Sequence, residues 1–167
     1  MKELAVVYYS FEGNTELVAK MIKEYNPNAD LIRLVPDKEP PRSLLGKFII
    51  GGKSVLLKEK VMIRSLGVDL NDYQAVIIAS PVWAGSYPPA LAAFFDRKRM
   101  EGKDVYLIAC SASGNAVNMI NEMVKQLDGN QVMSALSLRS PAKDPERTRE
   151  QVISLLRDIR DMAERNA

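Results

Sequence analysis

The sequence predicts a three-layer α/β fold: a five-stranded parallel sheet in the strand order 2-1-3-4-5, covered by helices on both faces. Two observations support this. Strand-length apolar runs alternate with segments of helical periodicity along all 167 residues. The runs are apolar throughout, which is typical of strands that are buried on both faces. The length fits a single domain, residues 1–167, without a linker, a repeat or a low-complexity segment.

The first three elements follow from the pattern near the start of the chain. A strand is expected at 4–9, where six apolar or aromatic residues follow one another. A helix follows, because apolar residues recur at helical spacing from Leu17 to Tyr25 with charged residues on the other face. The turn residues 26–28 end that helix, and a second strand is expected at 29–34.

The second half of the chain repeats the alternation. Strands are expected at 75–79, 105–110 and 132–138. Helices are expected near Pro89, a residue that suits a first helical turn, and from Val117 to Leu127, where Gly129 is expected to close the helix. Asp144 is expected to cap the last helix, with Pro145 as its first residue.

Composition excludes several kinds of chemistry. The chain has no histidine, so Ser-His-Asp and Cys-His catalysis and imidazole zinc sites are excluded. Its one cysteine, Cys110, is expected to be a small core residue and allows neither an internal disulfide nor an iron–sulfur site. Redox chemistry would therefore need a bound organic cofactor.

Charge and hydropathy limit which partners and which compartment are expected for the protein. The sum of 23 Lys and Arg against 21 Asp and Glu gives +2, too weak for a nucleic-acid or membrane surface. The chain has no targeting segment and no apolar run of ~18 residues, so no membrane is expected and the cytoplasm is the expected location.

In open sheets of this kind, ligands bind beyond the carboxyl ends of the strands, where the strand order reverses. The candidate residues are therefore those that follow the first, third and fourth strands. They are Ser10, Phe11, Glu12, Gly13, Asn14 and Thr15; Ser80, Pro81, Val82, Trp83, Ala84, Gly85 and Ser86; and Ser111, Ala112, Ser113, Gly114 and Asn115. These loops hold no lysine or arginine, so a phosphate there would be held by backbone dipoles.

Each loop allows two interpretations. The first opens onto a helix N-terminus, which binds phosphate, with Gly13 allowing a close approach of the backbone; alternatively, Asn14 or Thr15 merely caps the helix. In the second, Trp83 is expected outside the core with a plane that stacks on a flat ligand; alternatively, it is partly buried and covers the end of the sheet. The third, around Gly114, offers N–H groups to a heterocycle or is an ordinary turn.

These three segments resemble the flavin loops of the flavodoxin family, in order and spacing, over essentially the whole chain. Residues 10–15 are similar to its phosphate pattern Ser/Thr-x-Thr-Gly-x-Thr, and residues 80–88 to its second flavin loop. The resemblance implies that Ser10 and Gly13 to Thr15 hold the phosphate of FMN, that Pro81 to Ser86 flank the ring with Trp83 stacked on it, and that Ser111 to Asn115 contact its pyrimidine edge. The unsplit last strand resembles the short-chain branch.

Two departures from the family bear on function. Glu12 stands where the family has threonine, and a carboxylate there would repel a phosphate unless its side chain turns to solvent or bonds nearby N–H groups. Flavodoxins that carry electrons are usually acidic, whereas this chain has a sequence pI near 8.6. In the long connection 35–73, which also has a helical pattern at 54–63, basic residues gather at Lys47, Lys53, Lys58, Lys60 and Arg64. They form either a solvated face or a docking patch for an acidic protein or NADPH.

The resemblance implies an FMN-binding protein that transfers electrons through FMN, either as a carrier or as an NAD(P)H-linked reductase, with a redox partner protein or NAD(P)H as partner and a homodimer as a further expectation. An alternative is a scaffold of the same fold that has lost the cofactor and binds proteins. A phosphate-accepting signalling domain is disfavoured, because the third strand ends in Ala79 and Ser80 without an aspartate.

Overall fold

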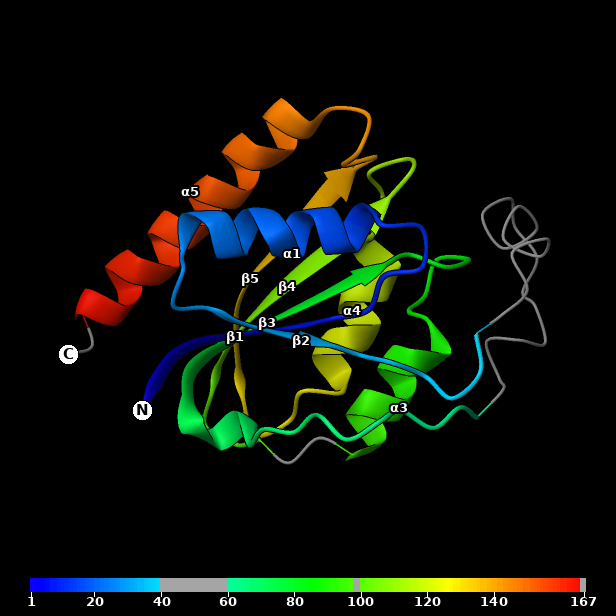
Figure 1. The fold of residues 1–167 in the computed structure, drawn as a ribbon, viewed down its shortest axis with the longest axis horizontal. Coiled ribbons are helices and arrows are strands. Elements are labelled where there is room, and N and C mark those ends of the chain that lie inside the picture. Colours follow the sequence, from blue (N-terminus) through cyan, green and yellow to red (C-terminus); the bar gives the residue numbers. More distant parts are fainter. Residues whose placement is uncertain (40–59, 98–99, 166–167) are drawn as a thin grey trace.

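A computed structural model describes residues 1–39, 60–97 and 100–165. Five parallel strands form one sheet in the order β2-β1-β3-β4-β5, as the sequence predicts (Figure 1). The strands are β1 (Lys2–Tyr8), β2 (Asp30–Arg33), β3 (Tyr73–Pro81), β4 (Asp104–Ser111) and β5 (Gln131–Arg139). Since they are parallel, their carboxyl ends lie at the same edge of the sheet.

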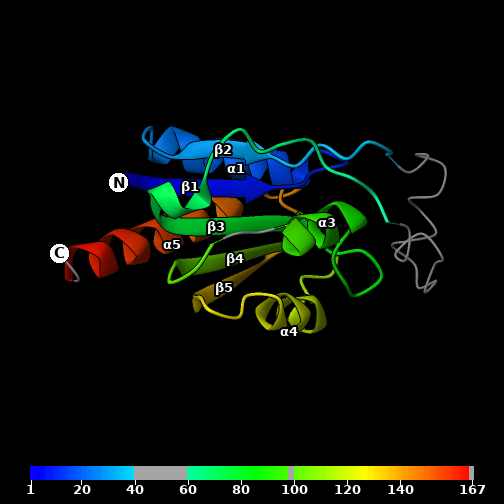
Figure 2. The same ribbon diagram turned by 90° about the horizontal axis from the view of Figure 1, so that it is seen from below.

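Helices cover both faces of the sheet (Figures 1 and 2). The helices are α1 (Asn14–Tyr25), α3 (Pro89–Arg97), α4 (Val117–Lys125) and α5 (Pro145–Arg165), with a short 3-10 helix η3 (Leu70–Asp72) before β3. Helices α1 and α5 pack on one face, and α3 and α4 on the other. Within the described residues, no helix has both the length and the apolar character that a membrane span requires.

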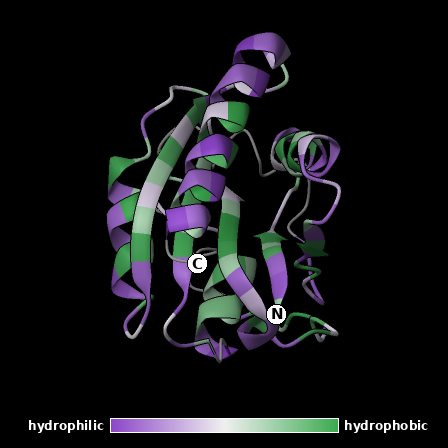
Figure 3. Ribbon diagram, turned by 90° about the vertical axis from the view of Figure 1, so that its left-hand side faces the viewer, coloured by the Kyte–Doolittle hydropathy of each residue, from purple (hydrophilic) through white to green (hydrophobic). Residues whose placement is uncertain are grey.

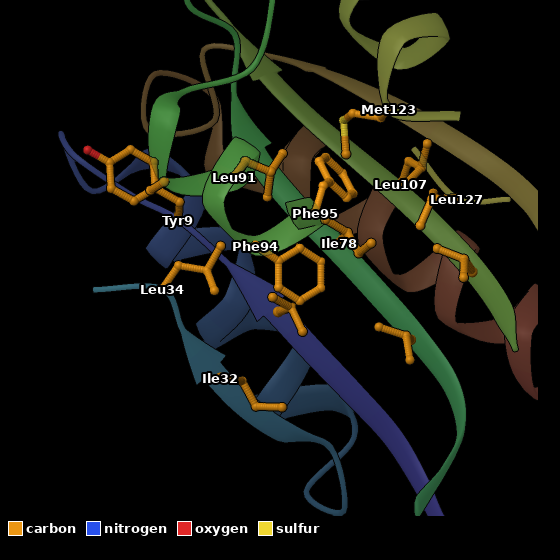
Figure 4. Packing of buried hydrophobic residues seen from close by; sticks show 14 of the residues in the cluster. Tyr9, Ile32, Leu34, Ile78, Leu91, Phe94, Phe95, Leu107, Met123 and Leu127 are labelled. Carbon is orange, nitrogen blue, oxygen red and sulfur yellow. The ribbon is translucent and has the colours of Figure 1, made fainter. Parts of the chain in front are cut away.

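The core lies in two layers, one on each side of the sheet. Successive residues of the central strands alternate between them: Val7 and Ile78 face α3 and α4, whereas Val6 and Ile77 face α1 and α5. Figure 4 shows the first layer, in which Phe94 of α3 packs over the strands. Hydrophobic residues accordingly dominate the central strands in the hydropathy view (Figure 3). This two-sided burial explains the apolar runs of the sequence.

Two local expectations were wrong. Helix α4 ends at Lys125, and Gly129 lies four residues further on in the turn that leads to β5, so it does not close the helix. Residues 60–63, the end of the expected helix 54–63, are extended: the backbone N–H of Arg64 donates to Val35 (2.9 Å), and Ile63 pairs with Pro36. Ile63 is buried while Met62 is exposed, which is the alternation of an extended segment.

Residues 40–59 lie outside the described residues, and with them Lys47, Lys53 and Lys58 of the expected basic patch. Lys60 and Arg64 are exposed. The docking patch therefore stays a prediction.

Candidate functional site

A cavity of about 700 Å³ lies at the carboxyl edge of the sheet, a volume typical of small-molecule sites. The loops after β1, β3 and β4 line it, as the fold predicts. The predicted residues that line it are Ser10, Phe11, Glu12, Asn14, Thr15, Pro81, Val82, Trp83, Ala84, Gly85, Ser111, Ala112, Ser113 and Asn115. Four predicted residues do not line it: Gly13, Ser80, Ser86 and Gly114.

The start of helix α1 forms one wall and leaves its backbone donors open. Gly13 is the N-cap residue, with φ 94° in the left-handed region that favours glycine, and no side chain in the described part of the protein caps the helix. The alternative that Asn14 or Thr15 caps the helix is therefore wrong. Because the first N–H groups of a helix have no acceptor within it, α1 presents donors and the positive end of its dipole to the cavity.

Two hydroxyl groups beside this helix start are buried without a strong hydrogen-bond partner among the described residues. Ser10 is 2% exposed and Thr15 is 1% exposed, both line the cavity, and among the described residues neither side-chain oxygen has an oxygen or nitrogen partner for a hydrogen bond. The Cys110 thiol does interact with the Thr15 hydroxyl, but a thiol is a weak partner. A buried polar group without a good partner costs about 1–3 kcal/mol, so these hydroxyls fit a ligand that accepts hydrogen bonds.

The second loop is a tight hairpin that helix α4 holds in place. Trp83 and Ser86 exchange backbone hydrogen bonds of 2.8 and 2.9 Å, while Ala84 (φ 49°) and Gly85 (φ 80°) are both left-handed. From α4, the Asn118 side-chain amide donates to the Gly85 carbonyl oxygen (3.2 Å). The Ser86 hydroxyl donates to the carboxylate of Glu122, also on α4. Ser86 therefore supports the loop from outside the cavity.

The expectation that Trp83 lies outside the core was wrong. Its side chain is 4% exposed and belongs to the core layer of α3 and α4, where it makes edge-on contacts with Tyr9 (5.8 Å between ring centroids) and Phe11 (5.9 Å). The hairpin at Ala84 and Gly85 explains this, because it turns the chain back over the end of the sheet. Trp83 also lines the cavity, so contact with a ligand stays a prediction.

The side chains of the third loop shape the loop itself. The Ser111 hydroxyl oxygen accepts from the backbone N–H of Gly114 (2.8 Å), and the Ser113 hydroxyl oxygen accepts from that of Asn115 (3.1 Å). Gly114 has φ 81°, and a Cβ there would lie 3.2 Å from the Cβ of Arg139, so its role is to let the loop pass close to β5. Ala112, Ser113 and Asn115 are exposed along the cavity.

A fourth segment lines the cavity, and the sequence analysis missed it. It follows β5 and contributes Ser140, Pro141, Ala142 and Lys143; the cavity also gains Cys110, Ala116 and Asn118. Its signal was present, since residues 140–144 follow a predicted strand as the other loops do. Glu12 and Lys143 are the charged residues among those described that line the cavity, so it is not free of cations.

Cys110 is a core residue, as predicted, at the inner end of the cavity. It is 4% exposed, and burial raises the pKa of its thiol to about 12, so at neutral pH it is a protonated thiol. A reactive thiolate requires the opposite shift.

Comparisons with known proteins identify the family and the fold. The family model described as NADPH-dependent FMN reductase matches residues 5–141. A flavoprotein from Lactobacillus acidophilus NCFM, solved in complex with FMN, is 19% identical with a TM-score of 0.63, over 87% of this chain and 98% of that one. Oxidised flavodoxin 2 from Bacillus cereus is 17% identical with a TM-score of 0.61, over 96% and 99%. No curated protein sequence matches the chain.

The two structures share the fold, and the family match extends over most of the chain. Together they confirm the predicted flavodoxin-like fold and the predicted cofactor, FMN. The chain belongs to the NADPH-dependent FMN reductase family of flavodoxin-like flavoproteins.

Proposed function

We propose that the chain binds FMN in the cavity at the carboxyl edge of the sheet and transfers electrons from NAD(P)H through it, as a reductase. One observation carries the proposal. The described residues include four buried polar side chains, and the two that line the cavity are the two that lack a hydrogen bond to a protein oxygen. Ser80 donates to Pro81 and Thr148 to Asp144, and neither lines the cavity. Ser10 and Thr15 have no such bond, and both line it.

The chemistry of this wall fits a phosphate. Backbone N–H groups at the start of α1 and the hydroxyls of Ser10 and Thr15 are all donors, and a phosphate dianion accepts several hydrogen bonds at once. Glu12, the departure from the family pattern, is exposed and forms no ion pair within the described part of the chain, so its carboxylate is free to point to solvent. Turning to solvent reduces the repulsion between this carboxylate and a bound phosphate without removing it.

The flavin ring would lie against the hairpin 83–86 and the loop 111–115, which complete the cavity. When bound, FMN supplies reversible electron transfer, and the protein supplies orientation and electrostatics. Asn118 holds the hairpin through Gly85, so this wall is fixed before a ligand arrives. The N–H groups of Gly114 and Asn115 are already engaged by hydroxyls of the loop, so the exposed polar side chains of Ser113 and Asn115 are the groups that would meet the polar edge of a heterocycle.

Two properties support a reductase over a carrier. The family description names NADPH as the electron donor. The net charge is +2, whereas flavodoxins that act as carriers usually have an acidic surface. A slightly basic protein attracts an anionic nucleotide better than an acidic one does.

A titration followed by rapid mixing tests the proposal. FMN added to the FMN-free protein should lose its fluorescence stoichiometrically as it enters the cavity. Anaerobic mixing of the complex with NADPH should then bleach the visible flavin absorbance. Binding without bleaching by NADPH or NADH would identify a carrier that needs a partner protein. Failure to bind FMN would reject the proposal and favour the scaffold that binds proteins. Size-exclusion chromatography of the same sample tests the homodimer.

A further inference from the structure

The segment that follows β5 is held in place by its own hydrogen bonds. We call residues 140–144, between β5 and α5, the β5–α5 loop. The backbone N–H of Ser140 donates to the Ser111 carbonyl (2.8 Å), and that of Lys143 donates to the Ser140 carbonyl (2.8 Å). The Ser140 hydroxyl donates to the Ala112 carbonyl (3.3 Å). At its end, Asp144 caps α5 by accepting from the N–H of Arg147 (3.2 Å). The backbone that carries Lys143 is therefore fixed.

A direct hydrogen bond joins this loop to the start of α1. The backbone N–H of Ala142 donates to Oδ1 of Asn14 (3.0 Å), and Asn14 is the first residue of α1. Lys143 is the next residue along the loop, and both it and Glu12 line the cavity. The loop thus brings one cation to the same end of the cavity as the buried hydroxyls of Ser10 and Thr15.

No carboxylate among the described residues competes for Lys143. Among residues 1–39, 60–97 and 100–165, no carboxylate lies within ion-pairing distance of its ammonium group, although six other ion pairs form there. Glu12 is likewise without a cation in that part of the chain. Both residues line the cavity and do not pair with each other, so both charges remain available to a charged ligand.

We propose that Lys143 pairs with the phosphate of the bound flavin and offsets the repulsion from Glu12, so that the β5–α5 loop adds to the preference for FMN over riboflavin that the start of α1 provides. This inference rests on the proposed function. A phosphate dianion beside an unpaired carboxylate is disfavoured, and a cation on the same wall restores the balance. Lys143 could instead pair with a phosphate of NADPH, and the experiment distinguishes this phosphate from that of FMN.

The test measures dissociation constants for FMN and for riboflavin by quenching of flavin fluorescence, at low and at high salt. Lys143→Gln should weaken FMN binding about fivefold at low salt, since the ion pair is exposed, and less at high salt. Riboflavin binding should not change. Lys143→Arg should bind FMN like the wild type, and Glu12→Gln should bind FMN several-fold more tightly. Lys125→Gln makes the same charge change on α4 away from the cavity and should have no effect.

The proposal is judged by how Lys143→Gln changes the affinities for FMN and riboflavin. A selective, salt-dependent loss of FMN affinity in Lys143→Gln supports it. An equal loss for FMN and riboflavin, or none, overturns it. A change confined to the ratio of kcat/KM for NADPH and NADH, with FMN affinity intact, also overturns it and assigns Lys143 to the nucleotide. If wild-type protein does not bind FMN at all, the proposed function fails, and that result is distinct from wild-type binding that Lys143→Gln leaves unchanged.

Discussion

Removing the Ser10 hydroxyl should separate binding from stability. The oxygen is buried and has no partner, so Ser10→Ala relieves a group whose burial costs about 1–3 kcal/mol in the FMN-free protein. The free energy of unfolding should therefore stay the same or rise by about 1 kcal/mol. A hydrogen bond to a charged group contributes about 1.5–3 kcal/mol, so the same change should weaken FMN binding about 10- to 150-fold.

Ser80→Ala is the matched control. Ser80 is fully buried in the neighbouring strand β3, but its hydroxyl donates to the Pro81 carbonyl (3.1 Å) and it does not line the cavity. This variant should lose about 1 kcal/mol of stability and bind FMN like the wild type. Urea unfolding of the FMN-free proteins gives the stabilities, and fluorescence titration with FMN and riboflavin gives the affinities.

The two substitutions should have opposite effects: Ser10→Ala lowers FMN affinity and keeps stability, whereas Ser80→Ala lowers stability and keeps FMN affinity. If Ser10→Ala destabilises the FMN-free protein as much as Ser80→Ala does, the Ser10 hydroxyl has a partner after all. If its FMN affinity is unchanged, the phosphate lies elsewhere. A loss of affinity for riboflavin equal to that for FMN would indicate a distorted cavity.

Three further predictions test the same wall and the hairpin. Thr15→Val should behave like Ser10→Ala, keeping stability while weakening FMN selectively, as measured by the same unfolding and titration experiments. Burial raises the pKa of the Cys110 thiol to about 12, so on raising the pH the thiol of the unfolded chain ionises first. This contribution to stability is intact below about pH 8.5 and is lost as the pH rises, and urea unfolding at pH 8 and 10 should show wild type losing about 2 kcal/mol more than Cys110→Ala. Ala84 has φ 49°, so Ala84→Gly should raise the free energy of unfolding by about 0.5–1 kcal/mol, whereas a loss would show that the turn is not strained.

The strands and the three loops were predictable because each depends on local pattern. A parallel strand buried on both faces is a continuous apolar run, and the loops that follow parallel strands must meet at one edge. The start of α1 was harder, because Asn14 and Thr15 are good capping residues and only the geometry shows that Gly13 occupies the cap position. Propensity alone does not decide between a cap and a ligand donor.

The features that sequence reasoning missed depend on contacts between distant residues. Trp83 follows a strand beside Pro81 and Gly85, which suggests an exposed loop, yet the left-handed turn folds the indole onto Tyr9 and Phe11. The β5–α5 loop joins the cavity through the contact of Ala142 with Asn14, residues far apart in the chain. The place of the β5–α5 loop after a predicted strand could have been recognised from the sequence, but neither contact has a signature in local periodicity or composition.

Without FMN, the N-terminus of α1 has unsatisfied hydrogen-bond donors, and these donors relate the free energy of unfolding to FMN binding. Helix α1 begins without a side-chain cap, beside two hydroxyls that have no good partner, although the strands around it are fully buried. A phosphate would satisfy the open N–H groups and both hydroxyls together, so it would act as the missing cap. Ligand binding then stabilises the fold by RT ln(1 + [L]/Kd), and the same atoms that lower stability without FMN supply affinity for it. The unsatisfied groups are therefore better explained as one site than as separate packing defects.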